Sequence, residues 1–100
     1  MDKRNWPYFE AYAKDVIGTF SNDQTLLNWD LYNEPGNRAI FSKLGSMEYF
    51  DPAMTAFSCS LTEASFRWAR DMAPKQPLTV GAWSTPQADG RGKAFNTEID

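Results

Sequence analysis

The sequence contains no histidine and only one cysteine, Cys59, and these absences exclude several kinds of site. Without histidine, neither a Ser-His-Asp triad nor a Cys-His pair can form within the chain. One cysteine cannot close an internal disulfide, and zinc is left without its usual ligands, so we expect no metal site. Acid–base chemistry in this chain would therefore fall to carboxylates.

The chain also lacks an excess of basic residues and any long apolar run. Ten Lys and Arg stand against thirteen Asp and Glu, which gives a net charge of −3 and no electrostatic support for nucleic-acid binding. No apolar stretch reaches the roughly 18 residues that a membrane helix needs. The opening MDKRNWPYFE has no apolar core of a signal peptide, so the localisation stays open.

What the sequence does contain suits one soluble globular domain, 1–100. Hydrophobic residues make up 42% of the 100 residues and charged residues 23%, as in ordinary globular chains. Aromatic residues reach 15%, with four tryptophans, which is rich for this length. Such an excess indicates a large core or flat platforms for ligands such as sugars, and we expect most of these rings to be core.

Two segments show the periodicity of helices. The first predicted helix runs from residue 6 to residue 20, with Pro7 in its first turn. The second runs over residues 60–73, with Ser60 or Thr62 as its N-cap and Pro74 just after its end. The side chains expected to face the core are Phe9, Ala13, Val16, Ile17 and Phe20 in the first helix and Leu61, Ala64, Trp68 and Met72 in the second.

Each predicted helix is followed by a predicted strand, 26–33 and 77–83, and residues 35–59 are predicted as a long irregular loop. This order is typical of a parallel α/β sheet, whose strands are usually apolar on both faces. The first strand alternates instead, and alternation alone suggests a half-exposed strand. In a parallel sheet covered by helices, one explanation of a polar face is a barrel whose inner face lines a polar site. One parity carries Leu27, Trp29 and Leu31, and the other carries Asn28, Asp30, Tyr32 and Glu34.

The stretch WDLYNEPGN (29–37), followed by WARDMAPKQPLTVGAW (68–83), resembles the clan of retaining glycoside hydrolases with (β/α)₈ barrels. It is most similar to glycoside hydrolase family 5, with its cellulases and mannanases, and to related β-xylanases. In that clan the fourth strand ends in Asn-Glu, often Asn-Glu-Pro, which here is Asn33-Glu34-Pro35. The resemblance covers nearly the whole chain, from the third helix to the fifth strand. It implies a fragment of a TIM barrel, with the remaining strands supplied from outside this sequence.

By this resemblance, Glu34 corresponds to the general acid/base and Asn33 to the residue that hydrogen-bonds the sugar 2-hydroxyl. Strict alternation would point Asn33 away from Glu34, so we expect an irregularity or bulge at the strand end. Trp83, delivered to the same rim by the second strand, is the candidate for sugar stacking. Tyr32, inward by parity, and Asn37, just past the turn, are further candidate substrate contacts.

The implied reaction is hydrolysis of a β-linked glycan with retention, without metal or cofactor. It needs a second carboxylate about 5–5.5 Å from the first. The family's nucleophile is a glutamate at the end of strand seven, and none of the three other candidates matches it. Glu48, Glu63 and Glu98 lie in the predicted loop, the predicted helix and the tail. The chain alone is therefore expected to be inactive.

Other interpretations stay open at this stage. The chain could be a non-catalytic carbohydrate-binding remnant, or a truncated reading frame without activity of its own. Glu34 could be a solvated residue before a turn, and Trp83 could equally be core. We expect Asp30 to be a buried structural residue paired with a group such as an arginine, and Trp29 and Trp68 to be core.

Overall fold

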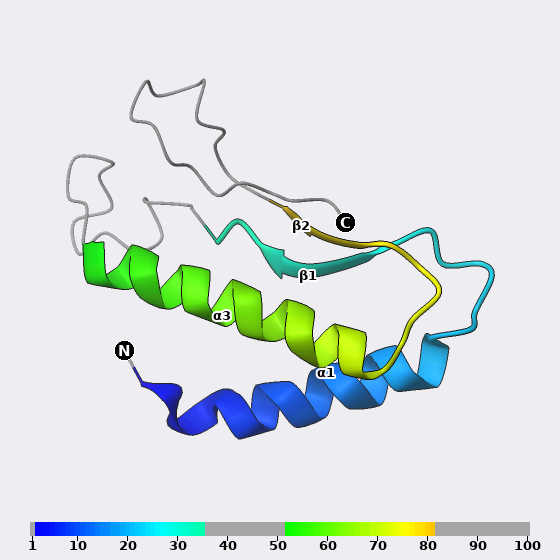
Figure 1. The fold of residues 1–100 in the computed structure, drawn as a ribbon, viewed down its shortest axis with the longest axis horizontal. Helices are drawn as coiled ribbons and strands as arrows, with labels where there is room; N and C mark the ends of the chain where they lie inside the picture. Colours follow the sequence, from blue (N-terminus) through cyan, green and yellow to red (C-terminus); the bar gives the residue numbers. More distant parts are fainter. Residues whose placement is uncertain (1, 36–51, 82–100) are drawn as a thin grey trace, which may run out of the picture.

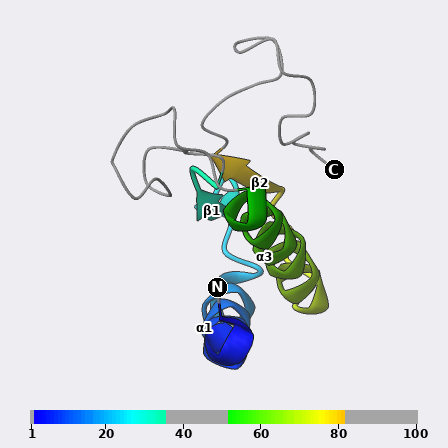
Figure 2. The same cartoon turned by 90° about the vertical axis from the view of Figure 1, so that its left-hand side faces the viewer.

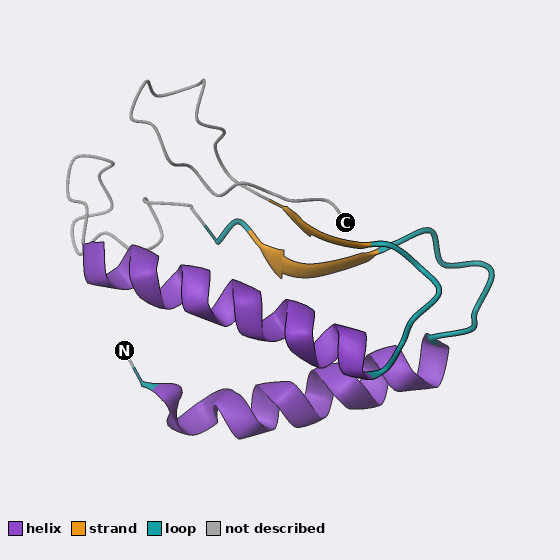
Figure 3. Cartoon of the chain, viewed as in Figure 1, coloured by secondary structure: helices purple, strands orange, loops and turns teal. Residues whose placement is uncertain are grey.

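The computed structural model of the chain describes residues 2–35 and 52–81. In chain order, the described elements are the 3₁₀ turn Lys3–Asn5, helix α1 (Trp6–Phe20), strand β1 (Trp29–Asn33), helix α3 (Pro52–Asp71) and strand β2 (Leu78–Gly81) (Figures 1 and 3). The two strands pair in parallel, and α3 lies in the connection between them. The prediction of a mixed α/β fold with parallel strands is confirmed for this part of the chain.

The helices and the sheet form layers. Both helices lie on one side of the two-stranded sheet, and α3 packs against both strands and against α1 (Figure 2). Helix α1 has the predicted bounds, but only the middle of its apolar face is buried, at Ile17. Phe9 and Phe20 remain 49% and 45% exposed. The two phenylalanines stay exposed because α1 packs on α3 rather than directly on the sheet.

Helix α3 begins earlier than its sequence pattern predicted. It starts at Pro52, where the fixed φ of proline suits a first helical position, rather than at residue 60. The predicted N-caps are wrong, since both residues lie inside the helix. The Ser60 hydroxyl donates to the Ala56 carbonyl and the Thr62 hydroxyl to the Ser58 carbonyl, each at 2.9 Å. Hydroxyls bonded back in this way are neutral in a helix rather than terminating it.

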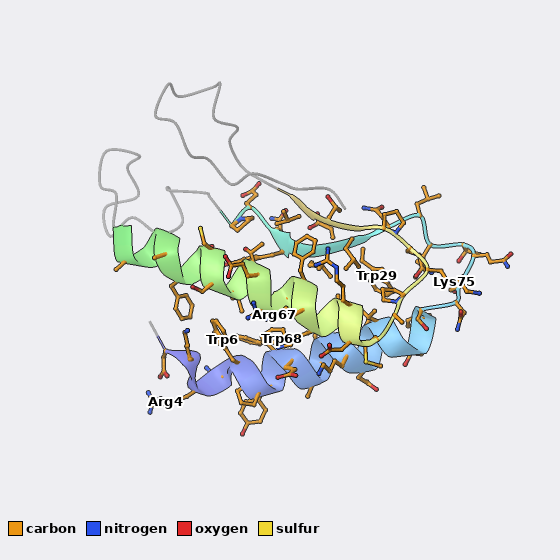
Figure 4. The ribbon with its side chains drawn as sticks, viewed as in Figure 1. Arg4, Trp6, Trp29, Arg67, Trp68 and Lys75 are labelled. Atoms are coloured by element: carbon orange, nitrogen blue, oxygen red, sulfur yellow. The ribbon has the colours of Figure 1, made fainter. Side chains whose placement is uncertain are left out.

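The core lies between α3 and its two neighbours. Ile17, Ala69 and Leu78 form its centre, and Trp29 packs against them. On the α1 side, Trp68 is 9% exposed and meets the Trp6 ring edge-on at 5.9 Å between centroids (Figure 4). The predicted core roles of Trp29 and Trp68 are confirmed. Burial of each such ring contributes about 1.5–3 kcal/mol or more.

Both strands begin later than predicted. The first parallel-ladder bond joins the Trp29 N–H to the Pro77 carbonyl at 2.9 Å, so β1 begins at Trp29 rather than at residue 26. Leu27, which shares the apolar parity of Trp29 and Leu31, is 86% exposed because it precedes the paired region. Strand β2 begins at Leu78, and Trp83 lies outside the described residues.

A buried amide ties the amino-terminal rim of the sheet together. Gln76 is 8% exposed, and its side-chain N–H₂ donates to the carbonyls of Phe20 at 3.2 Å and of Asp23 at 2.6 Å. Its Oε1 accepts the indole N–H of Trp29 at 3.2 Å. One side chain thus joins the end of α1, the following turn, the start of β1 and the approach to β2.

A charged cluster bridges the two helices at the surface. The Lys14 ammonium lies 2.8 Å from Asp71 on α3 and 2.7 Å from Glu10 on its own helix. Hydrogen bonding to Asp71, and then to Glu10, raises the pKa of Lys14 above its ordinary value. Because all three groups are partly exposed, solvent screening keeps the contribution of this cluster small.

Gln76→Ala should lower the free energy of unfolding by about 1–3 kcal/mol, because it leaves two part-buried carbonyls and an indole N–H without a partner. Urea denaturation measures this change. Gln24→Ala is the matched control, since Gln24 is exposed, and it should shift stability by less than about 0.5 kcal/mol. Equal unfolding midpoints for the two variants would show that the rim does not depend on this amide.

The turn after α1 should show a measurable acid dependence. The Asp23 carboxylate accepts the Thr25 hydroxyl at 2.7 Å and the Thr25 N–H at 2.8 Å, and these bonds lower the pKa of Asp23. A lowered folded-state pKa means that the contribution is present above the unfolded pKa, about 3.9. It is lost as the pH falls through the folded value.

In Thr25→Val, the pKa of Asp23 should rise toward its ordinary value, because the hydroxyl is the largest cause of the shift. An NMR titration of the Asp23 carboxyl carbon measures this. Thr25→Ser keeps the donor and should keep the pKa low. If Asp23 titrates identically in Thr25→Val and in the wild type, the hydroxyl is not the cause.

Candidate active site

The pairing of the two strands is irregular near their carboxyl ends. Asp30 lies opposite Thr79, and Asn33 lies opposite Gly81, so β1 uses three steps where β2 uses two. This extra residue is a β-bulge, and the predicted irregularity at the strand end is confirmed. Because the strands are parallel, their carboxyl ends lie at one shared edge.

The bulge turns Asp30 and Asn33 to the same face of the sheet, the one opposite the helices. A Cβ placed on Gly81 would lie 3.0 Å from Asp30 Oδ2 and 3.5 Å from Asn33 Oδ1. The Gly81 N–H donates to Asp30 Oδ1 at 3.1 Å. A side chain at position 81 would require the Asp30 carboxylate to shift by a few tenths of an ångström, whereas it would be in ordinary contact with Asn33.

The expectation for Asp30 is therefore corrected in the described residues. Asp30 is exposed rather than buried, and its carboxylate accepts the Gly81 backbone N–H. Asn33 is also exposed on this face. The two side chains, with Gly81 beneath them, form a polar surface at the strand ends.

The inward orientation predicted for Tyr32 is wrong. The bulge reverses the alternation after Leu31, so both Leu31 and Tyr32 are half-buried toward the helices. The Tyr32 hydroxyl lies 3.3 Å from the Ser58 hydroxyl of α3. Tyr32 also lines a cavity of about 250 Å³ between α1, β1 and α3, together with residues such as Tyr12 and Trp68.

Glu34 follows the bulge in a strained backbone conformation. Its φ is 50°, in the left-handed region that costs a non-glycine residue about 1–2 kcal/mol. The side chain is half-buried, and the Glu34 N–H donates to the Gly81 carbonyl at 2.7 Å. Strain of this kind persists only where the surroundings enforce it, and it is concentrated at functional sites.

The residue after Glu34 is anchored to helix α3. Pro35 is fully buried, and its carbonyl accepts the Ser58 hydroxyl at 2.6 Å. Sequence reasoning missed Ser58, because it placed this residue in an irregular loop. The bond spans 23 positions of the chain, and no local pattern around Ser58 indicates it.

The structure describes only some of the remaining predicted site residues. Asn33 and Glu34 lie next to each other at the strand edge, whereas Trp83 and Asn37 lie outside the described residues. Glu63 is exposed on α3, as its predicted helical position implied. Glu48 and Glu98 also lie outside the described residues.

Within residues 2–35 and 52–81, no three His, Cys, Asp or Glu side chains gather as a metal site would require. In the same part of the chain, neither helix is long and apolar enough to cross a membrane. Cys59 is half-buried, and burial, followed by the nearby charge of Glu63, raises the pKa of its thiol. A thiol with a raised pKa is a poor nucleophile.

Comparison of the chain with protein-family models, with curated proteins and with solved structures gave no match. The likeness to the barrel glycoside hydrolases therefore rests on the motif at residues 29–37 and on the helix–strand unit that follows it.

Replacing Glu34 by glycine or by alanine should show how much the left-handed backbone conformation costs in stability, because both variants remove the carboxylate. Glu34→Gly should be about 1 kcal/mol more stable than Glu34→Ala, because only glycine adopts this φ without penalty. Ala73, at φ 46° after α3, gives the calibration: Ala73→Gly should gain a similar amount. Urea denaturation compares all three variants. Equal stabilities of Glu34→Gly and Glu34→Ala, alongside a gain at position 73, would contradict strain at Glu34.

Proposed function

We propose that residues 1–100 supply the acid/base half of a retaining β-glycoside hydrolase site. The observation that carries the proposal is the conformation of Glu34, a strained glutamate held at the carboxyl end of a parallel strand beside Asn33. In (β/α)₈ barrels, catalytic side chains come from the carboxyl ends of the strands. The Asn-Glu-Pro motif occupies that place here.

The same geometry supports a barrel as the parent fold. The helices cover one face of the sheet, and the opposite face carries Asp30, Asn33, Thr79 and Gly81. In a closed barrel, the face away from the helices is the inner one. The α1–β1–α3–β2 unit would then be the third helix through the fifth strand, and the remaining strands would come from outside residues 1–100.

The proposed chemistry assigns one role to each member of the motif. The protonated Glu34 carboxyl donates its proton to the glycosidic oxygen while a second carboxylate attacks the anomeric carbon and the leaving group departs. The Glu34 carboxylate then takes a proton from water, which attacks the same carbon and releases the sugar with retention. The Asn33 amide donates a hydrogen bond to the 2-hydroxyl. The second carboxylate would come from outside the described residues.

Sugar binding without cleavage receives less support from the described residues. Trp6 and Trp68 pack between α1 and α3, and Trp29 packs against the core from β1 (Figure 4). None of these three rings is placed to stack a sugar beside Asn33, so a platform there would depend on Trp83. Glu34, by contrast, is half-buried at the carboxyl end of β1 beside Asn33, a place from which a general acid can reach a bound substrate.

The natural gene product that contains residues 1–100 provides the test. Glu34→Ala should lower kcat/KM by about 10²–10⁴-fold on phenyl β-glycosides, whose leaving group needs a proton. Dinitrophenyl β-glycosides need no such proton and should be affected much less. Added azide should restore turnover of the dinitrophenyl substrate in Glu34→Ala, with a β-configured glycosyl azide as the product.

Glu63→Ala is the control for this experiment, because Glu63 is exposed on the helix side, and it should leave both rates unchanged. Residues 1–100 expressed alone serve as the blank, since they lack the proposed nucleophile. Wild-type protein that binds β-glucans or β-mannans but cleaves no β-glycoside would favour the binding alternative. Equal loss on both substrates in Glu34→Ala would remove the acid/base role.

A further inference from the structure

Hydroxyl side chains within the two helices usually bond back to their own helix. Four of them do so here, each to the carbonyl four positions earlier. They are Thr19 to Asp15 at 2.7 Å, Ser60 to Ala56 at 2.9 Å, Thr62 to Ser58 at 2.9 Å and Ser65 to Leu61 at 2.8 Å. Ser58 departs from this pattern, because its hydroxyl donates out of the helix to the Pro35 carbonyl.

The surroundings of Ser58 make this bond a fixed one. Ser58 is 1% exposed, Pro35 is fully buried, and the distance between the Ser58 hydroxyl and the Pro35 carbonyl is 2.6 Å. The Tyr32 hydroxyl lies 3.3 Å from the same serine oxygen. A single hydroxyl on α3 therefore contacts the residues on either side of the Asn33–Glu34 pair.

The backbone of Glu34 is thus held from two directions. On the β2 side its N–H donates to the Gly81 carbonyl at 2.7 Å, and on the α3 side the next carbonyl along the chain accepts the Ser58 hydroxyl. A glutamate stays at φ 50° only when its surroundings over-determine that conformation. Removing one of the two anchors frees the Glu34 backbone to relax.

We propose that Ser58 is a positioning residue that holds the Glu34 carboxyl within reach of the leaving-group oxygen, an inference that rests on the proposed function. A general acid must come within hydrogen-bond distance of the oxygen that it protonates. A displacement of about 1 Å can cost about 10²-fold in rate. Because Ser58 acts only through the acid, its loss slows those substrates whose leaving group needs a proton.

The test uses Ser58→Ala in the natural gene product that contains residues 1–100. The kcat/KM on phenyl β-glycosides should fall by about 10- to 100-fold, and that on dinitrophenyl β-glycosides by less than about threefold. A merely structural loss of active enzyme would lower both rates equally. Ser65→Ala is the matched control on the same helix, since the Ser65 hydroxyl donates to the Leu61 carbonyl of its own helix. It should leave kcat/KM unchanged on both phenyl and dinitrophenyl β-glycosides.

Glu34→Gln, measured in parallel, separates the two proposals. If Glu34→Gln loses activity selectively on phenyl glycosides and Ser58→Ala does not, the positioning role of Ser58 is overturned while the proposed function stands. If Glu34→Gln shows no leaving-group dependence, the proposed function fails and the positioning role fails with it. Selective loss in both variants, with Ser65→Ala unaffected, supports the positioning role.

Ser58→Cys keeps the test decisive if Ser58→Ala does not fold, which circular dichroism and thermal melting would show. The thiol fills a similar space and donates only weakly. It should therefore produce the same selective loss on phenyl glycosides in a milder form. If kcat/KM of Ser58→Cys, relative to wild type, is the same on phenyl and on dinitrophenyl glycosides, the positioning role is overturned in that variant as well.

Discussion

The extra residue in β1 between Asp30 and Asn33 is the constraint on which the geometry of the strand ends depends. A strand with strict alternation would place these two side chains on opposite faces, because the side-chain period of a strand is two. With the bulge, both lie over Gly81, and Tyr32 turns to the helices instead. The polar surface and the orientation of Tyr32 toward α3 are thus two consequences of one backbone irregularity.

The two ends of the sheet are built differently. At the amino-terminal rim, the buried Gln76 side chain forms three hydrogen bonds. The Lys75 N–H also donates to the Ser21 carbonyl at 3.0 Å. At the carboxyl rim, the backbone of Glu34 is strained and the side chains of Asp30 and Asn33 are exposed. In α/β barrels, one end of the strands maintains stability and the other carries chemistry, and the proposed function would use the two rims of this sheet in the same way.

Helix α3 connects these two ends. Its inner row packs Ala69 against the core cluster of Ile17 and Leu78, which fixes the helix relative to the sheet. Because the helix is held there, Ser58, close to three turns earlier on it, presents its hydroxyl to the Pro35 carbonyl at a defined place. Packing in the middle of the unit is therefore what allows one hydroxyl to restrain the strained turn after β1.

Local pattern alone determined helix α1 to the residue, the presence of both strands and the position of the Asn-Glu-Pro motif at a strand end. It did so because periodicity and proline placement act within a few residues of the chain. The tertiary structure alone decided the orientation of Tyr32 and the roles of Ser58 and Gln76. Those features rest on a register shift and on hydrogen bonds that join residues 23 to 56 positions apart, and no neighbouring residue in the sequence encodes such a partner.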